Sequence, residues 1–450
     1  MKKENTMTPM MQQYMKTKEE YKDCILFYRL GDFYEMFFED ALTASKELEI
    51  TLTGKNCGME ERAPMCGVPF HAVDSYLNKL VSRGYKVAIC EQVEDPKLAK
   101  GIVKREVVRV VTPGTNTDIQ ALDESRNNYI MCIVYLDDRY GIAIADVSTG
   151  DYFVTELSDS TRLKDELFKF MPTEIICNEA FYMSGMDMED LRERLGITIS
   201  ALDSWYFDDD LCKNKLTEHF HAANMQALGL EDFNCGSISA GALLIYLYET
   251  QKNSLAHLTH IQVYTTGAYM LLDSSTRRNL ELCETLREKQ KRGSLLWVLD
   301  KTKTAMGARA LRKYIEQPLV DKKEILKRQD AVEELKENAI SREELREYLG
   351  PVYDLERLIT KITYQSANPR DMLVFKNSLA MLPSVRYILE EMQSELLQTL
   401  YQDLDPLEDL CQLIEHAIAE EPPIAMRDGG IIREGFDSEV DRLKKARTEG

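Results

Sequence analysis

The sequence predicts a multidomain fold in which two mixed α/β domains precede a long all-α region. Its 450 residues suffice for roughly three domains of about 100–200 residues. Short β-branched runs alternate with amphipathic stretches in the first part, whereas helical spacing dominates from about residue 275. Hydrophobic residues make up 44% and charged residues 29% of the chain, so each domain can build a core.

The first domain is expected to span residues 1–112. Gly31-Asp32 predicts a turn, and Asp32 with Glu35 three residues later has the spacing of a capping box, so we expect a helix to begin at Phe33. A stripe of Phe33, Phe37 and Ala41 would then face the core. The other elements expected here are strands at 23–30, 85–91 and 106–112 and a helix at about 71–83.

Residues 113–127 are rich in helix and strand breakers and predict a linker. A second α/β domain is expected over 128–255, with strands at 128–137, 141–147, 152–156 and 174–177 and helices at about 161–170, 187–194 and 237–250. Residues 265–436 predict a helical domain, with helices at 277–290, 294–301, 305–315, 321–337, 342–348, 351–363, 369–382, 384–400 and 404–418. A further helix begins near Asp437 and is unfinished at Gly450, so we expect the sequence to be a piece of a longer protein.

Composition excludes several classes of protein. No apolar run approaches the roughly 18 residues that a membrane-spanning helix needs. The lysines near the N-terminus are not followed by an apolar stretch, so we expect no secretory signal peptide. The ten cysteines form no C-x-x-C pair, which argues against a zinc site and against a disulfide framework. Scattered free thiols favour a reducing compartment, so a cytoplasmic location is expected.

Charge is distributed unevenly along the chain. The net charge is −20, yet residues 1–115 hold 17 basic and 17 acidic side chains. Within this neutral part, the stretch from Lys79 to Arg109 has eight basic and four acidic residues, a net +4. A negative total therefore does not exclude a local face that binds anions such as nucleic acid.

Phe33 and Glu35 each have two interpretations from the residues alone. An exposed ring at residue 33 could wedge between bases and unstack them, or it could simply be the first member of the apolar stripe. Glu35 is either a capping-box carboxylate or a group that faces DNA, which is unusual because phosphates repel carboxylates.

Eight sequence segments together carry a resemblance to the MutS family of bacterial DNA mismatch repair proteins. The resemblance extends from about residue 8 to the last residue, and the segments follow one another at the family's spacing. The segment Gly31-Asp-Phe-Tyr-Glu35 resembles the mismatch-reading Phe-x-Glu motif of that family. The other seven are residues 63–72, 87–92, 109–115, 273–282, 354–357, 367–371 and 427–430.

This resemblance implies a function for each part of the chain. Residues 1–112 would form a mismatch-recognition domain, 128–255 a connector domain with an RNase H-like fold, 265–436 the helical core and lever domain, and 437–450 the start of a clamp region. The aromatic ring of Phe33 would stack on the mispaired base while Glu35 hydrogen-bonds to it. The residues expected to hold the DNA backbone are Lys79, Lys104, Arg105 and Arg109.

The resemblance also implies partners and cofactors. The partners would be duplex DNA with mismatches or small loops and a MutL-type protein bound by the connector; the full-length family forms homodimers, whereas this chain alone is expected to be monomeric. ATP and Mg²⁺ belong to the full-length family. No G-x-x-x-x-G-K-[ST] phosphate-binding loop occurs in the sequence, so this chain is expected to bind no ATP and to be no enzyme, with no catalytic or metal-binding residue.

Two alternative functions stay open at this point. Asp137, Asp138 and Asp146 lie in the RNase H-like region and could belong to a metal-dependent nuclease. Turn and strand-end aspartates are the preferred explanation, because no second cluster of Asp or Glu at strand ends completes a two-metal site. A MutS-like scaffold that has lost mismatch reading is the other alternative, and the intact Phe33-x-Glu35 pair argues against it.

Overall fold

The computed structural model shows two compact units. The first combines Met1–Leu122 with Asn128–Tyr264, and the second combines Asp123–Asn127 with Thr265–Gly450. The structure describes residues 7–59, 61–94, 101–265, 267, 269–424 and 428–449. Lys97 and Lys100 of the basic stretch, Arg427 of the last family segment and Gly450 lie outside the described residues.

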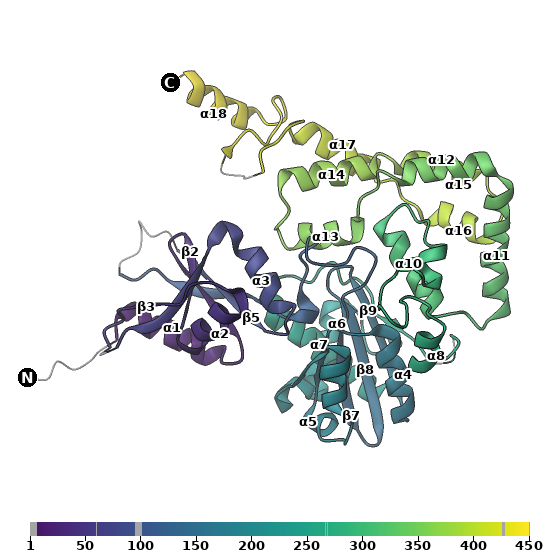
Figure 1. Cartoon of the computed structure of the whole chain (residues 1–450). Helices are drawn as coiled ribbons and strands as arrows, with labels where there is room; N and C mark the ends of the chain where they lie inside the picture. The colour runs from purple at the N-terminus through teal and green to yellow at the C-terminus, as the bar shows by residue number, and fades with distance from the viewer. Residues whose placement is uncertain are drawn as a thin grey trace, which may run out of the picture. The chain divides into compact units, whose positions relative to one another are not determined.

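A six-stranded mixed sheet with the order β3-β4-β2-β1-β5-β6 forms the first domain (Figure 1). β1 and β5 run parallel, and every other neighbouring pair is antiparallel. The strands expected near 23–30, 85–91 and 106–112 are confirmed as β1, β5 and β6. The elements are α1 (Pro9–Glu20), β1 (Ile25–Leu30), β2 (Phe33–Phe37), α2 (Phe38–Leu48), β3 (Thr53–Lys55), β4 (Ala63–Pro69), the 3-10 turn η1 (Phe70–Ala72), α3 (Val73–Val81), β5 (Val87–Gln92) and β6 (Arg105–Val111).

The prediction of a helix beginning at Phe33 is wrong. Leu30 pairs with Phe33, so Gly31 and Asp32 are the two-residue loop of a β-hairpin, and Gly31 takes a φ of 61°. Such tight loops favour glycine because their backbone twist requires positive φ. The five residues of β2 are mostly aromatic or apolar and fit a pleated strand, and the helix α2 begins only at Phe38.

The second domain is built on a sheet with the order β11-β10-β7-β8-β9-β12. β7, β8 and β9 form an antiparallel meander, and β10 and β11 continue from β7 in parallel, which fits the expected RNase H-like fold. Its elements are η2 (Pro113–Thr115), β7 (Ile130–Leu136), β8 (Arg139–Asp146), β9 (Asp151–Leu157), α4 (Ser160–Phe170), β10 (Glu174–Cys177), α5 (Glu179–Tyr182), η3 (Asp190–Arg194), β11 (Thr198–Ala201), η4 (Ser204–Phe207), α6 (Asp209–His219), η5 (Gln226–Leu228), α7 (Asn234–Gln251) and β12 (Gln262–Val263).

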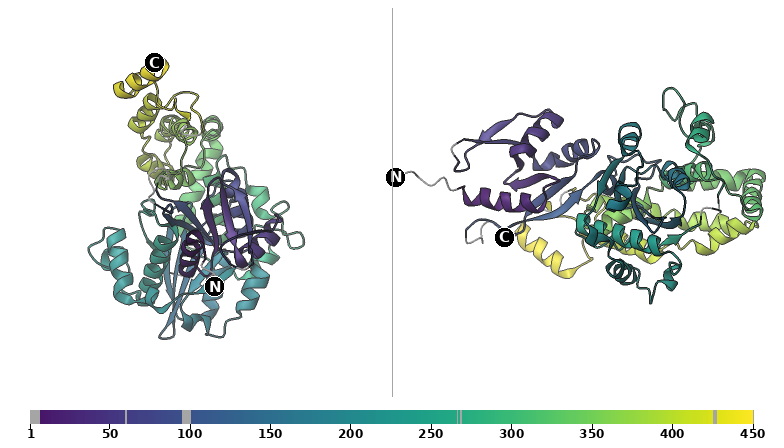
Figure 2. Two further views of the ribbon diagram at one scale, coloured as in Figure 1. Left: turned by 90° about the vertical axis from the view of Figure 1, so that its left-hand side faces the viewer. Right: turned by 90° about the horizontal axis from the view of Figure 1, so that it is seen from below.

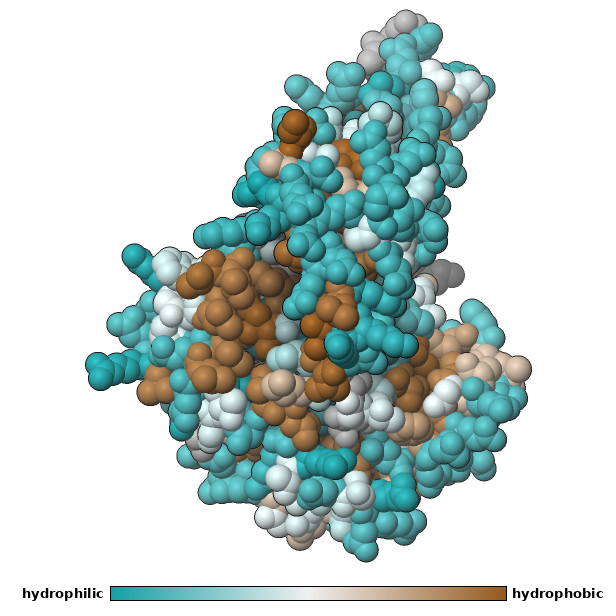
Figure 3. All heavy atoms as spheres, turned by 90° about the vertical axis from the view of Figure 1, so that its right-hand side faces the viewer, coloured by the Kyte–Doolittle hydropathy of each residue, from teal (hydrophilic) through white to brown (hydrophobic). Residues whose placement is uncertain are grey.

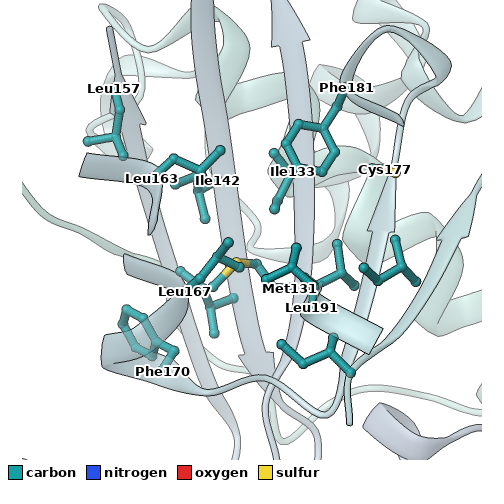
Figure 4. Packing of buried hydrophobic residues seen from close by; sticks show 14 of the residues in the cluster. Met131, Ile133, Ile142, Leu157, Leu163, Leu167, Phe170, Cys177, Phe181 and Leu191 are labelled. Atoms are coloured by element: carbon teal, nitrogen blue, oxygen red, sulfur yellow. The ribbon is translucent and has the colours of Figure 1, made fainter. Parts of the chain in front are cut away.

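The core of this domain lies between the sheet and α4. In Figure 4, Met131 of β7 lies beside Leu167 of α4, Ile142 of β8 lies beside Leu163 of α4, and Ile133 of β7 lies beside Phe181 of α5. α7 packs along β7 and β8 and is buried along most of its length. The sequence did not predict α1, β3, β4, β11 or α6.

The segment after β6 is fixed to the second domain by a buried carboxylate. Glu174 accepts hydrogen bonds from the Gly114 backbone N–H at 3.0 Å and from the Tyr246 hydroxyl at 2.7 Å, and also from the Thr112 hydroxyl. Only glycine fits at residue 114, because an added Cβ would lie 2.7 Å from the Cβ of Ile130. The start of the expected linker is therefore an ordered turn.

The second unit is helical, as expected, and Figure 2 shows its green and yellow helices from two further sides. Two expected helices differ in the structure. The helix expected over 277–290 ends at Asn279, and the helix expected over 384–400 is divided in two, because the Glu334 carboxylate accepts the backbone N–H groups of Gln393 and Ser394 between the halves. The helices are α8 (Ser274–Asn279), α9 (Leu295–Leu299), α10 (Ala305–Glu316), α11 (Lys322–Glu337), α12 (Ala339–Leu349), α13 (Leu355–Thr363), α14 (Pro369–Leu379), α15 (Leu382–Glu390), α16 (Glu395–Asp403), α17 (Glu408–Ala417) and α18 (Ser438–Glu449).

Buried arginines hold the short segment Asp123–Asn127 within the helical unit. Arg357, which is 1% exposed, donates to the carbonyl oxygens of Asp123 at 2.9 Å and Arg126 at 2.8 Å. Arg309 donates to the Glu124 carbonyl oxygen at 3.0 Å and forms a two-point ion pair with Asp354. Between the first and the second domain, the chain therefore passes through the helical unit.

The surface carries apolar side chains in clusters as well as singly. On the face in Figure 3, brown apolar side chains gather in several areas across the middle of the view, and hydrophilic side chains cover most of the remainder. In the part of the chain that the structure describes, no helix combines the length and the apolar character needed to cross a membrane.

We predict that Arg357→Ala releases the segment Asp123–Asn127. Breaking a buried charged network typically costs about 3–5 kcal/mol, because the remaining polar groups are left without partners. Urea unfolding should show this loss, and hydrogen exchange should show faster exchange of the amides in the segment. Arg442→Ala, at an arginine whose side chain is 73% exposed and pairs with Glu439, is the control and should change stability by less than about 1 kcal/mol. Unchanged exchange in Arg357→Ala would contradict the role of the arginine.

Candidate nucleic-acid interface

Phe33 stands at the exposed start of β2. Its side chain is 47% exposed, although it lies directly opposite Pro69 of β4 and Leu30 of β1. The two-residue hairpin loop Gly31-Asp32 leads directly into this residue. Phe33 is therefore an aromatic side chain held outside the core by a strand that is paired on both sides.

The alternation of β2 explains why this ring is outside while its neighbours are inside. Tyr34 and Met36 face the core cluster that includes Phe27 and Val68, whereas Phe33, Glu35 and Phe37 point to the other face. Phe37 is 1% exposed because Tyr14 of α1 packs edge-on against its ring. α1 thus covers the far end of this face.

Phe70 is a second exposed aromatic residue, and its backbone lies near the end of β2 where Phe33 stands. It follows Pro69, the strand partner of Phe33, and its backbone N–H donates to the Asp32 carbonyl oxygen at 2.9 Å. The guanidinium carbon of Arg29 lies 3.7 Å from the centre of the Phe70 ring, so a cation stacks on this ring. Sequence reasoning missed Phe70, although it lies inside one of the family segments.

Glu35 points to the same face as Phe33, and its carboxylate meets a lysine from β3. The Lys55 Nζ lies 2.5 Å from Glu35 Oε2, and the two side chains are 33% and 16% exposed. Glu35 is therefore no capping-box residue, since it lies in a strand. No pattern in the sequence pointed to Lys55, which lies 20 residues further along the chain, on the strand beyond β4.

Lys79 and Lys104 keep their ammonium groups at the surface. Lys79, on α3, lies 4.0 Å from the Glu49 carboxylate. Lys104 is 64% exposed at its side chain and pairs with Glu106. Such exposed pairs are weak and exchange readily with phosphates, so both lysines can serve as contacts to a nucleic-acid backbone.

Arg105 and Arg109 use their guanidinium groups within the protein. Arg105 donates to the carbonyl oxygens of Arg29 at 2.8 Å and Val103 at 3.0 Å, and to Gln13. Arg109 donates to the Thr117 hydroxyl at 2.9 Å. Their hydrogen bonds favour a structural role, so Lys79 and Lys104 are the stronger candidates for backbone contacts.

The three aspartates of the second domain do not form one site. Asp146 lies at one end of the eight-residue strand β8 and Asp138 precedes the other end, about 25 Å away at roughly 3.3 Å per residue. Asp146 is fully buried and accepts hydrogen bonds from the Asn128 and Ser148 backbone N–H groups at 3.0 and 2.9 Å. Among the residues that the structure describes, no group of three or more His, Cys, Asp or Glu side chains is placed to hold a metal ion. The three aspartates of the nuclease alternative therefore do not form one metal site in this structure.

The first domain thus presents an edge suited to an unstacked base. Phe33 offers an exposed aromatic face, and the Glu35 carboxylate, two residues along on the same face of β2, offers a hydrogen-bond acceptor. The Phe70 ring packs 6.4 Å from the Tyr34 ring and carries Arg29, the strand partner of Tyr34, so it belongs to the opposite face of the sheet. Aromatic rings stack on bases regardless of sequence, whereas a single acceptor reads only a base edge that has become accessible.

Three parts of the chain match domain models of known proteins. Three domain models of one family match in order: MutS domain I at residues 8–120, MutS domain II at 128–262 and MutS domain III at 275–449. Phe33, Glu35, Lys55 and Phe70 all lie within the first match.

Several curated relatives match along almost the whole chain. Those from Lachnoclostridium phytofermentans, Acetivibrio thermocellus and Clostridium tetani are 62%, 51% and 46% identical, and each match covers 99% of this chain. Each is named DNA mismatch repair protein MutS. The chain spans about half the length of the relatives it matches: 48%, 51% and 50% of these three.

We predict that Phe33→Ala leaves the fold nearly as stable as before, within about 1 kcal/mol, because a half-exposed side chain leaves no cavity. Phe37→Ala, on the same strand and face, is the matched control and should cost about 3–5 kcal/mol, because that ring is buried. Urea unfolding of the two variants measures both losses of unfolding free energy. Equal losses would place Phe33 in the core.

Proposed function

The chain belongs to the MutS family, and from that membership we propose that its first domain binds mismatched or looped base pairs in duplex DNA. The observation that carries the proposal is the exposed ring of Phe33 at the start of β2, beside the acceptor of Glu35. In this proposal the ring inserts beside the mispaired base and stacks on it, and Glu35 hydrogen-bonds to that base.

Discrimination follows from the deformability of the DNA. Opening a step of normal duplex costs a few kcal/mol in lost stacking, and an inserted side chain bends the helix at that step. A mismatch has already lost part of its pairing and stacking, so insertion costs less there. The protein therefore selects a weak point in the duplex and reads no fixed base sequence.

Contacts to phosphates supply affinity without selectivity. Lys79 and Lys104 are surface cations of the same domain and are proposed to hold the DNA backbone, while Arg105 and Arg109 of β6 make hydrogen bonds within the protein. Binding of this kind weakens steeply with salt, by a slope of about −0.9 for each phosphate neutralised.

The proposal extends to partners of the second domain and of the whole protein. The family resemblance implies a MutL-type protein as the partner of the connector domain and a homodimer as the assembly. ATP and Mg²⁺ are not assigned to this chain, because its sequence has no phosphate-binding loop, and the absence of ATPase activity stays a prediction. Ten free cysteines, eight of them buried, support a reducing, cytoplasmic compartment.

Competition binding with a G·T duplex and its matched counterpart tests the proposal. The 450-residue chain should prefer the G·T duplex, and Phe33→Ala should remove most of that preference, since base–aromatic stacking is worth about 1–3 kcal/mol. Leu52→Ala, at an exposed apolar residue of the same domain, is the control and should keep the preference.

The same assay separates this proposal from the scaffold alternative. A MutS-like scaffold would bind both duplexes equally, and Phe33→Ala would change nothing. A preference for G·T that survives Phe33→Ala would show mismatch recognition by another route and would contradict the wedge.

A further inference from the structure

We propose that Lys55 is the residue that positions and neutralises Glu35, so that the domain can offer an acceptor to a base without offering net charge to the DNA backbone. The inference rests on the proposed function and adds a specificity-determining residue to its site.

The pair is built across three strands. Lys55 ends β3, Glu35 is the middle residue of β2, and β4 lies between them in the sheet. The lysine Nζ reaches across β4 to lie 2.5 Å from Glu35 Oε2. The same Nζ lies 5.7 Å from the centre of the Phe37 ring, so the ring and the carboxylate together fix where the ammonium group sits.

The direct neighbours of Glu35 on the two paired strands leave its carboxylate to Lys55. On β4 the opposite residue is Gly67, which has no side chain, and a Cβ added there would lie 3.6 Å from Glu35 Cγ. On β1 the opposite residue is Tyr28, whose hydroxyl donates to Gln13 at 2.6 Å. In the described part of the chain, Lys55 is the one cation that pairs with this carboxylate.

The positive charge of Lys55 offsets the repulsion between the Glu35 carboxylate and the DNA phosphates. Duplex DNA carries one negative charge per about 1.7 Å of its length, so a bare carboxylate at the reading edge would be repelled before any base contact formed. With Lys55 in place, the site has no net charge toward the phosphates while Glu35 keeps lone pairs for a base edge. The lysine belongs to an edge strand and is partly exposed, so its removal leaves the core intact.

A double-mutant cycle on the 450-residue chain tests the inference. Lys55→Gln should weaken binding to a G·T duplex about three- to ten-fold when Glu35 is present, in line with coupling between contacting residues. In the Glu35→Gln background the same substitution should change binding less than about two-fold. Lys55→Arg keeps the positive charge and should restore binding. Lys46→Gln, at an exposed lysine of α2, is the control and should leave binding unchanged. Melting curves of all variants should show that they fold.

Two results would overturn the inference. Equal weakening in both backgrounds, with the salt slope smaller by about one, would make Lys55 a direct phosphate contact. No weakening in either background would show that the pair has no part in binding. If the unsubstituted chain did not prefer the G·T duplex, the proposed function itself would fail; a preserved preference without coupling defeats only the role of Lys55.

Discussion

The register of β2 between β1 and β4 is the constraint on which the candidate interface depends. Because side chains alternate along a strand, this register sends Tyr34 and Met36 into one core and leaves Phe33 and Glu35 on the other face. A shift by one residue would bury Phe33 and expose Tyr34. The exposed ring is thus secured by the packing of its own neighbours.

The sequence predicted the fold best where local patterns and tertiary pairing agree. The β-branched runs of β5 and β6 and the meander of the second domain are examples. It failed at β2, because Asp32 and Glu35 imitate a capping box while pairing with β1 and β4 imposes a strand. It also failed near Ser394, where a carboxylate from another helix interrupts an otherwise helical pattern.

The candidate site, too, was predicted only where its residues form a local pattern in the sequence. Phe33 and Glu35 belong to one short segment and carry a recognisable motif. Lys55 comes to the site through strand pairing, which no local pattern encodes. Conversely, Arg105 looked like a surface cation in the sequence, but its guanidinium group serves backbone carbonyl oxygens within the domain.

The central claim is that the side chain at position 33 lies against the mispaired base. Replacing Phe33 by a photo-crosslinking phenylalanine analogue and irradiating the 450-residue chain on a G·T duplex tests it directly. The account predicts that the crosslink maps to the mispaired base or its immediate neighbour and is much weaker on the matched duplex. Crosslinks spread along both duplexes, or equal on matched and mismatched DNA, would contradict it.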